Sequence, residues 1–235
     1  MSTALAIFVK TPGTSPVKTR LAQTLGREQA ERFHVLAAQA VAAVACTAGP
    51  DILPYWAVAE SAALGHRLWT QFPAIWQGTG GLGERMDRVF SRLQRRHGKV
   101  LLLGADTPQI DTAILHAACR ALEDPATPHV IGPASDGGFW LFGARCPVPS
   151  DIWHAPPYSS SQTARIFEDR LSTLGGIAHL SMKTDLDHAE DLPALVCELD
   201  ALPAPLPAQQ ALRAWLEKWL GCSDSNETPR CTPPC

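Results

Sequence analysis

Short apolar segments alternate along the chain with longer segments that are apolar on one side only. The short runs have the composition of strands buried on both faces of a sheet. They occupy residues 4–9, 55–59, 100–103, 129–134, 139–142 and 177–182. Helical spacing of apolar residues predicts helices over 27–48, 61–72, 86–93, 111–123, 163–174 and 208–220. This alternation predicts an α/β fold whose mostly parallel sheet is covered by helices on both faces.

The apolar run 100–103 stops abruptly at Gly104, Asp106 and Pro108. Asp106 is therefore expected where a buried strand ends, which is the edge of an α/β sheet at which ligands bind. A carboxylate in that position can hold a hard cation through its oxygens. The alternative is an Asp that begins a turn before a helix capped by Asp111.

A loop with a high density of positive charge follows the first predicted strand. Residues 10–20 contain two prolines and a glycine, which stop both strand and helix. Lys10, Lys18 and Arg20 suit an anionic ligand, because Arg offers bidentate contacts and Lys a point charge. An ordinary solvated loop is the alternative. Neither a Walker loop nor a Gly-x-Gly-x-x-Gly turn follows this strand.

A second loop, Gln77-Gly-Thr-Gly-Gly-Leu-Gly-Glu-Arg-Met86, contains four glycines just before a predicted helix. Such a loop lets a ligand approach the backbone, and the free N–H groups of a helix start favour negative charge. A flexible turn without a ligand is the alternative reading.

Three further carboxylates are candidates for chemistry. Asp136 stands on a predicted tight turn between two strands, either as a rigid mount facing a substrate or as a turn residue. Asp185 and Asp187 point to the same side of an extended segment. Two carboxylates there are costly unless a cation lies between them, and Lys183 or a metal ion can serve. His34 is interpreted as a structural residue, and His188 as a capping or surface residue.

Composition bounds the class of partner. The chain has 235 residues, 46% of them hydrophobic, and a formal net charge of −3. This charge disfavours broad attraction to nucleic acid or anionic membranes and favours a small-molecule partner. No apolar run is long enough to cross a bilayer and no leader pattern precedes residue 10, so a cytoplasmic protein is expected.

The last segments of the chain are expected to differ from the rest. Residues 1–200 are interpreted as the main domain, 201–221 as a helical extension and 222–235 as a disordered tail. The extension is amphipathic and suits packing on the domain or on a second copy, so a homodimer stays open. Cys222, Cys231 and Cys235 in the tail fit no zinc template.

The chain resembles a known superfamily through an ordered set of motifs that spans residues 4–195. They are Phe8-Val-Lys-Thr-Pro-Gly13, Val17-Lys-Thr-Arg-Leu-Ala22, Leu82-Gly-Glu-Arg-Met86, Gly104-Ala-Asp-Thr-Pro108, Gly132-Pro-Ala-Ser-Asp-Gly-Gly-Phe-Trp140 and Asp185-Leu-Asp-His-Ala-Glu-Asp-Leu192. The set is similar to that of bacterial glycosyltransferase-A-like (nucleotide-diphosphosugar transferase) proteins of the rSAM/selenodomain-associated type. Relatives include 2-phospholactate and molybdenum-cofactor guanylyltransferases. Ala105, Thr107 and His188 depart from the pattern.

This resemblance implies a three-layer αβα sandwich that binds a nucleotide and a divalent cation. The residues implied for nucleotide binding are Lys10, Gly13, Lys18, Arg20, Gln77, Gly81 and Asp106. Asp106 and Asp187 are implied as ligands of Mg²⁺ or Mn²⁺, and Asp136 and Lys18 are the candidate catalytic residues.

Three functions are consistent with these residues. The first is glycosyl transfer from a nucleotide sugar to a small acceptor, with Asp136 taking the acceptor's proton. The second is nucleotidyl transfer from a nucleoside triphosphate to a phosphorylated small molecule, with release of pyrophosphate. The third is a nucleotide-sugar-binding protein without catalytic activity.

Overall fold

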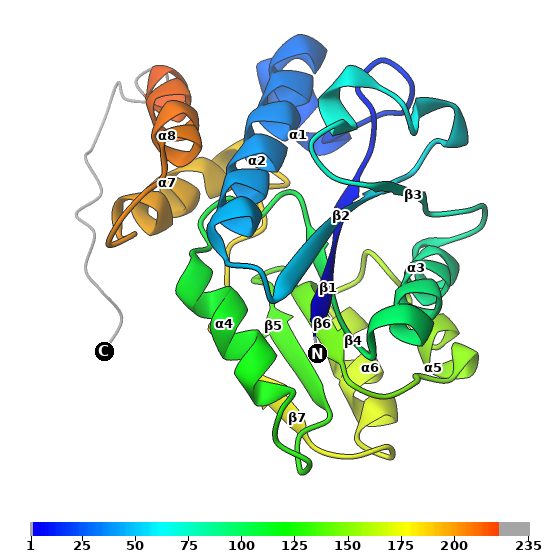
Figure 1. Ribbon diagram of the computed structural model, residues 1–235. Coiled ribbons are helices and arrows are strands. Elements are labelled where there is room, and N and C mark those ends of the chain that lie inside the picture. Colours follow the sequence, from blue (N-terminus) through cyan, green and yellow to red (C-terminus); the bar gives the residue numbers. More distant parts are fainter. Residues whose placement is uncertain (1, 221–235) are drawn as a thin grey trace.

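The computed structural model describes residues 2–220, which form a seven-stranded sheet with helices around it (Figure 1). The strands are β1 (Thr3–Val9), β2 (Ile52–Val58), β3 (Ala74–Trp76), β4 (Lys99–Gly104), β5 (His129–Pro133), β6 (Phe139–Ala144) and β7 (Ile177–His179). The α-helices are α1 (Thr19–Leu25), α2 (Arg27–Thr47), α3 (Leu82–His97), α4 (Thr112–Ala121), α5 (Ser150–His154), α6 (Thr163–Leu171), α7 (Leu192–Asp200) and α8 (Pro207–Leu220). Short 3₁₀ helices are η1 (Ser61–Ala63), η2 (Arg67–Trp69) and η3 (Ala189–Asp191).

The strands lie in the order β3-β2-β1-β4-β6-β5-β7. Only β6 runs antiparallel to its neighbours, which are β4 and β5. In the parallel part, Ile7 of β1 lies opposite Trp56 of β2 and Leu103 of β4. The carboxyl ends of these three strands therefore meet at one edge of the sheet, where an open α/β sheet places its ligands.

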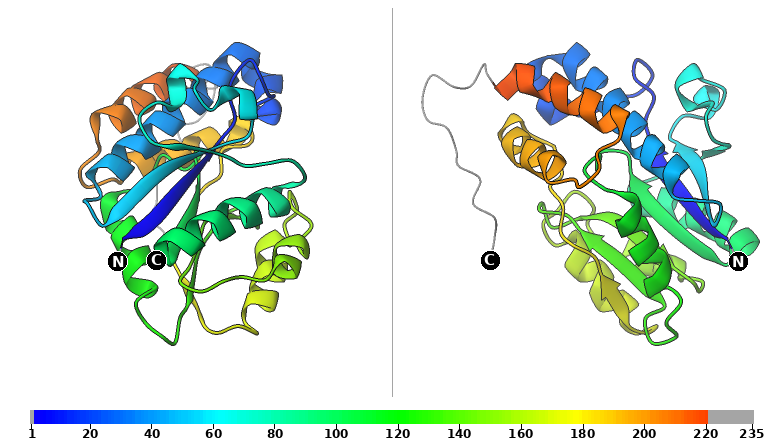
Figure 2. Two further views of the ribbon diagram at one scale, coloured as in Figure 1. Left: turned by 45° about the vertical axis from the view of Figure 1, so that its right-hand side comes forward. Right: turned by 60° about the vertical axis from the view of Figure 1, so that its left-hand side comes forward.

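The alternation of side chains between the two faces of β1 explains the layers of the fold. Leu5 and Ile7 lie in one buried cluster with apolar residues of α2 and α4. Ala4 and Ala6 lie in a second cluster with apolar residues of α3, α5 and α6. Because successive strand residues point to opposite faces, each face of the sheet buries its own set of helices. Figure 2 shows the helices on either side of the strands, and the predicted three-layer αβα sandwich is confirmed.

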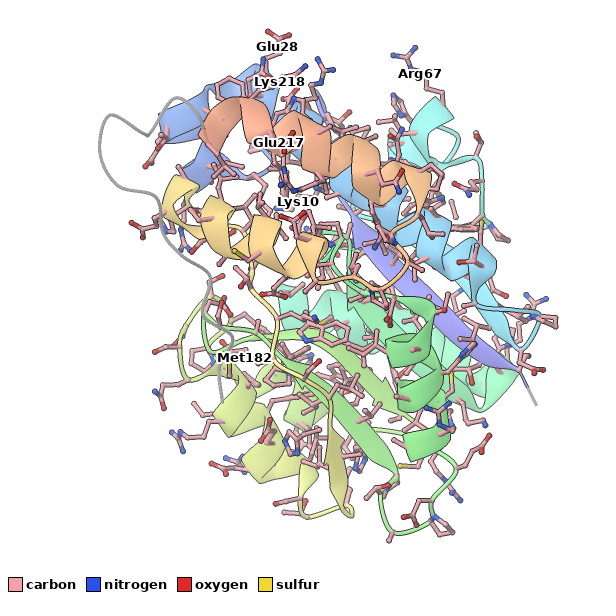
Figure 3. The ribbon with its side chains drawn as sticks, turned by 90° about the vertical axis from the view of Figure 1, so that its left-hand side faces the viewer. Lys10, Glu28, Arg67, Met182, Glu217 and Lys218 are labelled. Atoms are coloured by element: carbon pink, nitrogen blue, oxygen red, sulfur yellow. The ribbon has the colours of Figure 1, made fainter. Side chains whose placement is uncertain are left out.

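The last two helices pack on the rest of the chain. Trp215 of α8 lies 6.3 Å, ring to ring, from Phe33 of α2, in a cluster that also includes α7. Buried Gln209 of α8 donates from Nε2 to the carbonyls of Pro108 (2.7 Å) and Ile110 (2.8 Å). This helix thereby fixes the segment just after Asp106. Figure 3 faces α7 and α8 and shows Glu217 and Lys218 on α8.

The structure corrects the helix predicted over 61–72. This segment contains only the two 3₁₀ turns η1 and η2. Gly65 interrupts it, and Pro73 favours an extended conformation for the residue before it, so a continuous helix is disfavoured. Trp69 is nevertheless buried and packs with its ring centroid 5.0 Å from that of Trp56.

Three smaller observations concern the starts of helices. The short helix α1 was not expected and begins inside the predicted loop 10–20. Helix α6 begins after Gln162, whose side chain makes no cap hydrogen bond. Asp111 does cap α4, because its Oδ1 accepts the N–H of Ile114 at 2.9 Å.

Between residues 2 and 220, no helix is both long and apolar enough to cross a bilayer. The tail predicted over 222–235, with its three cysteines, lies outside the described residues.

Candidate functional site

A cleft of about 720 Å³ opens at the carboxyl edge of the sheet. Its walls come from the ends of β1 and β4, the β5–β6 turn, and segments 158–163 and 185–187. The residues predicted to bind or react that line it are Lys10, Lys18, Arg20, Gln77, Asp106, Asp136 and Asp187. These residues are far apart in the sequence, so the fold brings them together.

The basic loop (residues 10–20, the last two of which begin α1) is anchored at its start. The N–H of Thr11 donates to Glu60 Oε2 at 3.0 Å, and Trp69 Nε1 donates to Thr11 Oγ1 at 3.0 Å. Gly13 has φ +79, a conformation that favours glycine, and it does not line the cleft. Its role in this structure is to turn the loop, and a contact with nucleotide stays a prediction.

Lys18 holds the centre of the site. Its side chain is 5% exposed and its backbone is left-handed, with φ 43. Its Nζ lies 3.0 Å from Asp106 Oδ2, 3.1 Å from Asp185 Oδ1 and 3.2 Å from Asp187 Oδ1. We call the three acids the carboxylate cluster. One ammonium therefore joins the loop after β1, the end of β4 and the segment after β7.

The charges in the cluster do not balance. Burial alone would lower the pKa of Lys18, but Asp106, Asp185 and Asp187 outweigh it and raise that pKa above its usual range. Burial would raise the pKa of Asp106, but Lys18 and His34 lower it well below its usual range. Burial and the two neighbouring acids raise the pKa of Asp185 to about 6, despite Lys18. Asp185 is therefore the acid of the cluster whose ionised form is the least favoured.

His34 is a site residue that the sequence reasoning interpreted as structural. It is buried on α2, with Nδ1 3.2 Å from Asp106 Oδ1 and Nε2 2.9 Å from the Lys10 carbonyl. Both partners offer oxygen acceptors, so the ring nitrogen that carries a proton determines which of the two bonds His34 donates. The one signal in the sequence was a histidine on the apolar face of an Ala-rich helix.

The cation that lies between Asp185 and Asp187 is Lys18, not Lys183. Lys183 Nζ lies instead 3.5 Å from Glu198 Oε2. Asp187 is shared further, because Arg20 Nη1 donates to its Oδ2 at 2.9 Å. The expectation that both acids point to one side is confirmed by their common contact with Lys18.

Side chains of α3 form hydrogen bonds to the glycine loop (residues 77–81). The N–H of Gly81 donates to Glu84 Oε2 at 2.6 Å, and Arg88 Nη1 donates to the carbonyls of Gln77 (2.9 Å) and Thr79 (3.0 Å). Gln77 lines the cleft, with Nε2 donating to Ala57 O at 2.8 Å, whereas Gly81 does not line it. Nucleotide binding by these two residues stays a prediction.

Asp136 stands on the β5–β6 turn, as predicted. Its Oδ1 accepts the N–H of Gly138 at 2.8 Å, and the side chain is exposed at the cleft. No ion pair holds it to any residue in the described part of the chain. Its carboxylate is free to meet a ligand.

No group of three or more His, Cys, Asp or Glu side chains in residues 2–220 is arranged to hold a metal ion. The position that the carboxylate cluster surrounds is taken by Lys18 Nζ. The predicted ligands Asp106 and Asp187 do share that position, so their role depends on whether the ammonium can leave it.

Solved structures share this fold. A protein from Desulfovibrio desulfuricans G20, provisionally described as a nucleotide-diphospho-sugar transferase, superposes with a TM-score of 0.83 and 21% identity, covering 96% of this chain and 100% of that one. A cytidylyltransferase from Leptospira borgpetersenii serovar Hardjo-bovis gives 0.53 and 11%, covering 98% and 100%. CMP:2-keto-3-deoxy-manno-octonic acid synthetase complexed with CTP gives 0.51 and 13%, covering 93% and 99%. No curated protein matches the chain.

These likenesses establish the nucleotide-diphospho-sugar transferase fold that the motifs predicted. Resemblance to the two guanylyltransferases in particular stays a prediction. At the level of sequence, residues 21–160, more than half of the chain, match a family described as "Uncharacterized protein conserved in bacteria". The chain therefore belongs to the bacterial family DUF2064.

Proposed function

We propose that the protein is a metal-dependent transferase with a nucleotide-activated donor, and that it transfers a glycosyl group from a nucleotide sugar to a small acceptor. The observation that carries this proposal is one cleft that contains both the basic loop and the carboxylate cluster, at the carboxyl ends of β1 and β4. Open α/β sheets bind their ligands at that edge. The likeness in fold to nucleotide-using enzymes supports the same proposal.

The donor's phosphates are proposed to bind at the basic loop. Lys10 is exposed at the cleft, and the side chain of Arg20 is 53% exposed. Both side chains can therefore reach a diphosphate in the cleft from exposed positions. Arg can also bind two oxygens of the diphosphate at once. Gln77 lines the same cleft and is proposed to contact the base or ribose through its amide oxygen.

Asp106 and Asp187 are proposed to hold Mg²⁺ or Mn²⁺. The donors fit, because carboxylate oxygens are the ligands that hard cations prefer. The placement also fits, since both acids already share one cationic partner, Lys18 Nζ, at 3.0 Å and 3.2 Å. When bound, such a cation neutralises the donor's phosphates. Lys18 Nζ would then leave the cluster and be available to the phosphates.

Asp136 is proposed as the general base and Lys18 as the group that stabilises departing charge. The acceptor's hydroxyl oxygen forms a bond to the sugar carbon of the donor, while the bond from that carbon to the phosphate oxygen breaks. The hydroxyl proton passes to Asp136, and the nucleoside diphosphate leaves with the electron pair. Lys18, with Lys10 and Arg20, stabilises its negative charge.

Nucleotidyl transfer is the second candidate, favoured by the fold shared with two cytidylyltransferase-type enzymes. In that reaction a phosphate oxygen of the acceptor attacks the α-phosphorus of a nucleoside triphosphate, and pyrophosphate leaves. The same cations would serve. Asp136 would then hold the metal or the substrate. A nucleotide-sugar-binding protein without activity is the third candidate.

The test incubates the protein with Mg²⁺ or Mn²⁺ and a panel of nucleotide sugars or nucleoside triphosphates. Thermal stability shows binding, since a ligand at about 100 times its Kd adds about 2.7 kcal/mol to the folded state. Release of nucleoside diphosphate supports glycosyl transfer, and release of pyrophosphate supports the alternative. Binding without either product leaves the third candidate.

Two variants make the test specific. Asp106→Asn should lose both the stabilisation by nucleotide and its dependence on the cation. Asp169→Asn, an exposed acid on α6 away from the cleft, is the matched control and should behave as the unmodified protein. If nucleotide and cation stabilise Asp106→Asn as much as they stabilise the unmodified protein, the proposal is rejected.

A further inference from the structure

Positive charge is confined to one side of the cleft. Of the residues that line it in the described part of the chain, the Lys, Arg and His residues are Lys10, Lys18, Arg20 and His34. All four belong to the basic loop or to α2. The opposite side, formed by residues 134–140 and 158–163, lines the cleft without any basic side chain. We call it the acceptor wall.

The acceptor wall presents a carboxylate, hydroxyls and aromatic rings. Asp136 is exposed there, and so are Ser159 and Ser161, whose hydroxyls make no hydrogen bond to another described residue. Phe139 and Tyr158, which are both half-buried, add aromatic surface. Small-molecule sites commonly combine such rings with a few polar groups that fix orientation.

This wall is built rigidly. Gly137 has φ +87, and a Cβ added to it would lie 2.2 Å from the Ser161 carbonyl. Its own carbonyl accepts the N–H of Ala164 at 2.9 Å. Thr163 Oγ1 donates within the neighbouring loop, with Ser160 O 2.7 Å away. The turn that carries Asp136 and the loop that carries the serines are therefore held against each other, so the wall is preorganised for a ligand.

We propose that the acceptor is an uncharged compound with several hydroxyl groups, and that the acceptor wall discriminates against phosphorylated compounds. This inference rests on the proposed function. A phosphate placed on this wall would face the Asp136 carboxylate without a compensating cation, which disfavours it. Hydroxyl groups can instead donate to Asp136 and exchange hydrogen bonds with the serines. The division of charge thereby favours glycosyl transfer over nucleotidyl transfer to a phosphorylated acceptor.

The test measures saturation-transfer NMR with matched pairs of probes. Glycerol, glucose and inositol are each compared with their own monophosphate ester, with a nucleoside diphosphate and Mg²⁺ present to fill the basic side. We expect at least one uncharged probe to bind with a Kd at least about tenfold lower than its ester. Tighter binding of the esters, or no binding by any uncharged probe, overturns the inference.

Two variants locate the effect. Asp136→Asn should weaken binding of the uncharged probe about tenfold, because the probe loses a hydrogen bond to a charged group. The difference in Kd between the probe and its ester should become smaller. Ser161→Arg adds a cation to the acceptor wall and should strengthen ester binding about tenfold. Asp169→Asn should change neither. If Asp136→Asn and Ser161→Arg leave both affinities unchanged, the wall is not the acceptor site.

Failure of this inference differs from failure of the proposed function. If nucleoside diphosphate does not stabilise the protein, the proposed function fails whatever the acceptor probes do. If nucleoside diphosphate binds and the phosphate esters bind most tightly beside it, only the uncharged acceptor is overturned.

Discussion

The basic loop and the glycine loop both follow strands of the same parallel array, yet their polar groups have different partners. The basic loop brings Lys10, Lys18 and Arg20 to the cleft, and its ion pairs reach the distant carboxylate cluster. The glycine loop bonds to its own following helix, through Glu84 and Arg88. Glycine content alone therefore does not make a phosphate site, because a nearby side chain can satisfy an exposed N–H first, as Glu84 does for Gly81.

The largest expected effect is at the basic loop. Lys18→Met removes the ammonium that is proposed to stabilise the departing nucleoside diphosphate, so activity should fall about 10³-fold. It also leaves three acids without their shared cation. The free energy of unfolding should fall by about 2 kcal/mol, a value discounted because each acid is about one-third exposed. Turnover and urea denaturation measure the two losses. Lys99→Met, which removes a 3.5 Å pair with Glu123, is the control and should cost under about 1 kcal/mol.

Two arginine variants, one at each loop, test whether the basic loop and the glycine loop differ in their effects on nucleotide binding and stability. Arg20→Ala should weaken nucleotide binding about tenfold and leave stability nearly unchanged, because its pair with Asp187 is largely exposed. Arg88→Ala should do the reverse, lowering the free energy of unfolding by about 1 kcal/mol through two lost hydrogen bonds. Calorimetric titration and denaturation measure both. A loss of nucleotide affinity in Arg88→Ala would show that the loops are alike.

Burial of Asp185 beside two other acids predicts a dependence of stability on pH. Because the pKa of Asp185 is raised to about 6, its contribution to stability is complete at low pH and is lost as pH rises through 6. Asp185→Asn resembles the protonated acid at every pH. Its melting temperature should exceed that of the unmodified protein at pH 8 and equal it near pH 4. A variant that is less stable at pH 8 would contradict this charge balance.

The smallest expected effect is at the glycine loop. Glu84→Ala removes the acceptor of the Gly81 N–H and should cost about 0.5 kcal/mol, within the range of helix-cap losses. Nucleotide affinity should not change. Denaturation and calorimetric titration check the two statements. A gain in affinity would mean that the uncapped N–H groups bind phosphate, as the sequence pattern alone predicts.

Much of the fold was predictable because the spacing of apolar residues, and the residues that end helices and strands, are local properties of the sequence. The strand before Asp106, the capped helix after it and the turn that carries Asp136 all follow from neighbouring residues. The segment 61–72 was misjudged because its apolar residues have helical spacing while Gly65 and Pro73 break it.

The site was predictable only in part, because its partners are distant in the chain. The motifs identified Lys18 and Asp106, but not that Lys18 bonds to Asp185 and Asp187, more than 160 residues away. His34 was missed for the same reason, because the helical spacing of apolar residues does not show which strand end lies opposite that helix. Such contacts come from the three-dimensional arrangement of the sheet.

The central claim is that the basic loop and Asp106 bind the phosphates of one nucleotide. Calorimetric titration of nucleoside diphosphate with Mg²⁺ tests it most directly, on the unmodified protein, Asp106→Asn and the control Asp169→Asn. We expect one nucleotide per chain, with affinity at least about tenfold lower in Asp106→Asn and unchanged in the control. Undiminished binding by Asp106→Asn, or no binding by the unmodified protein, would contradict the account.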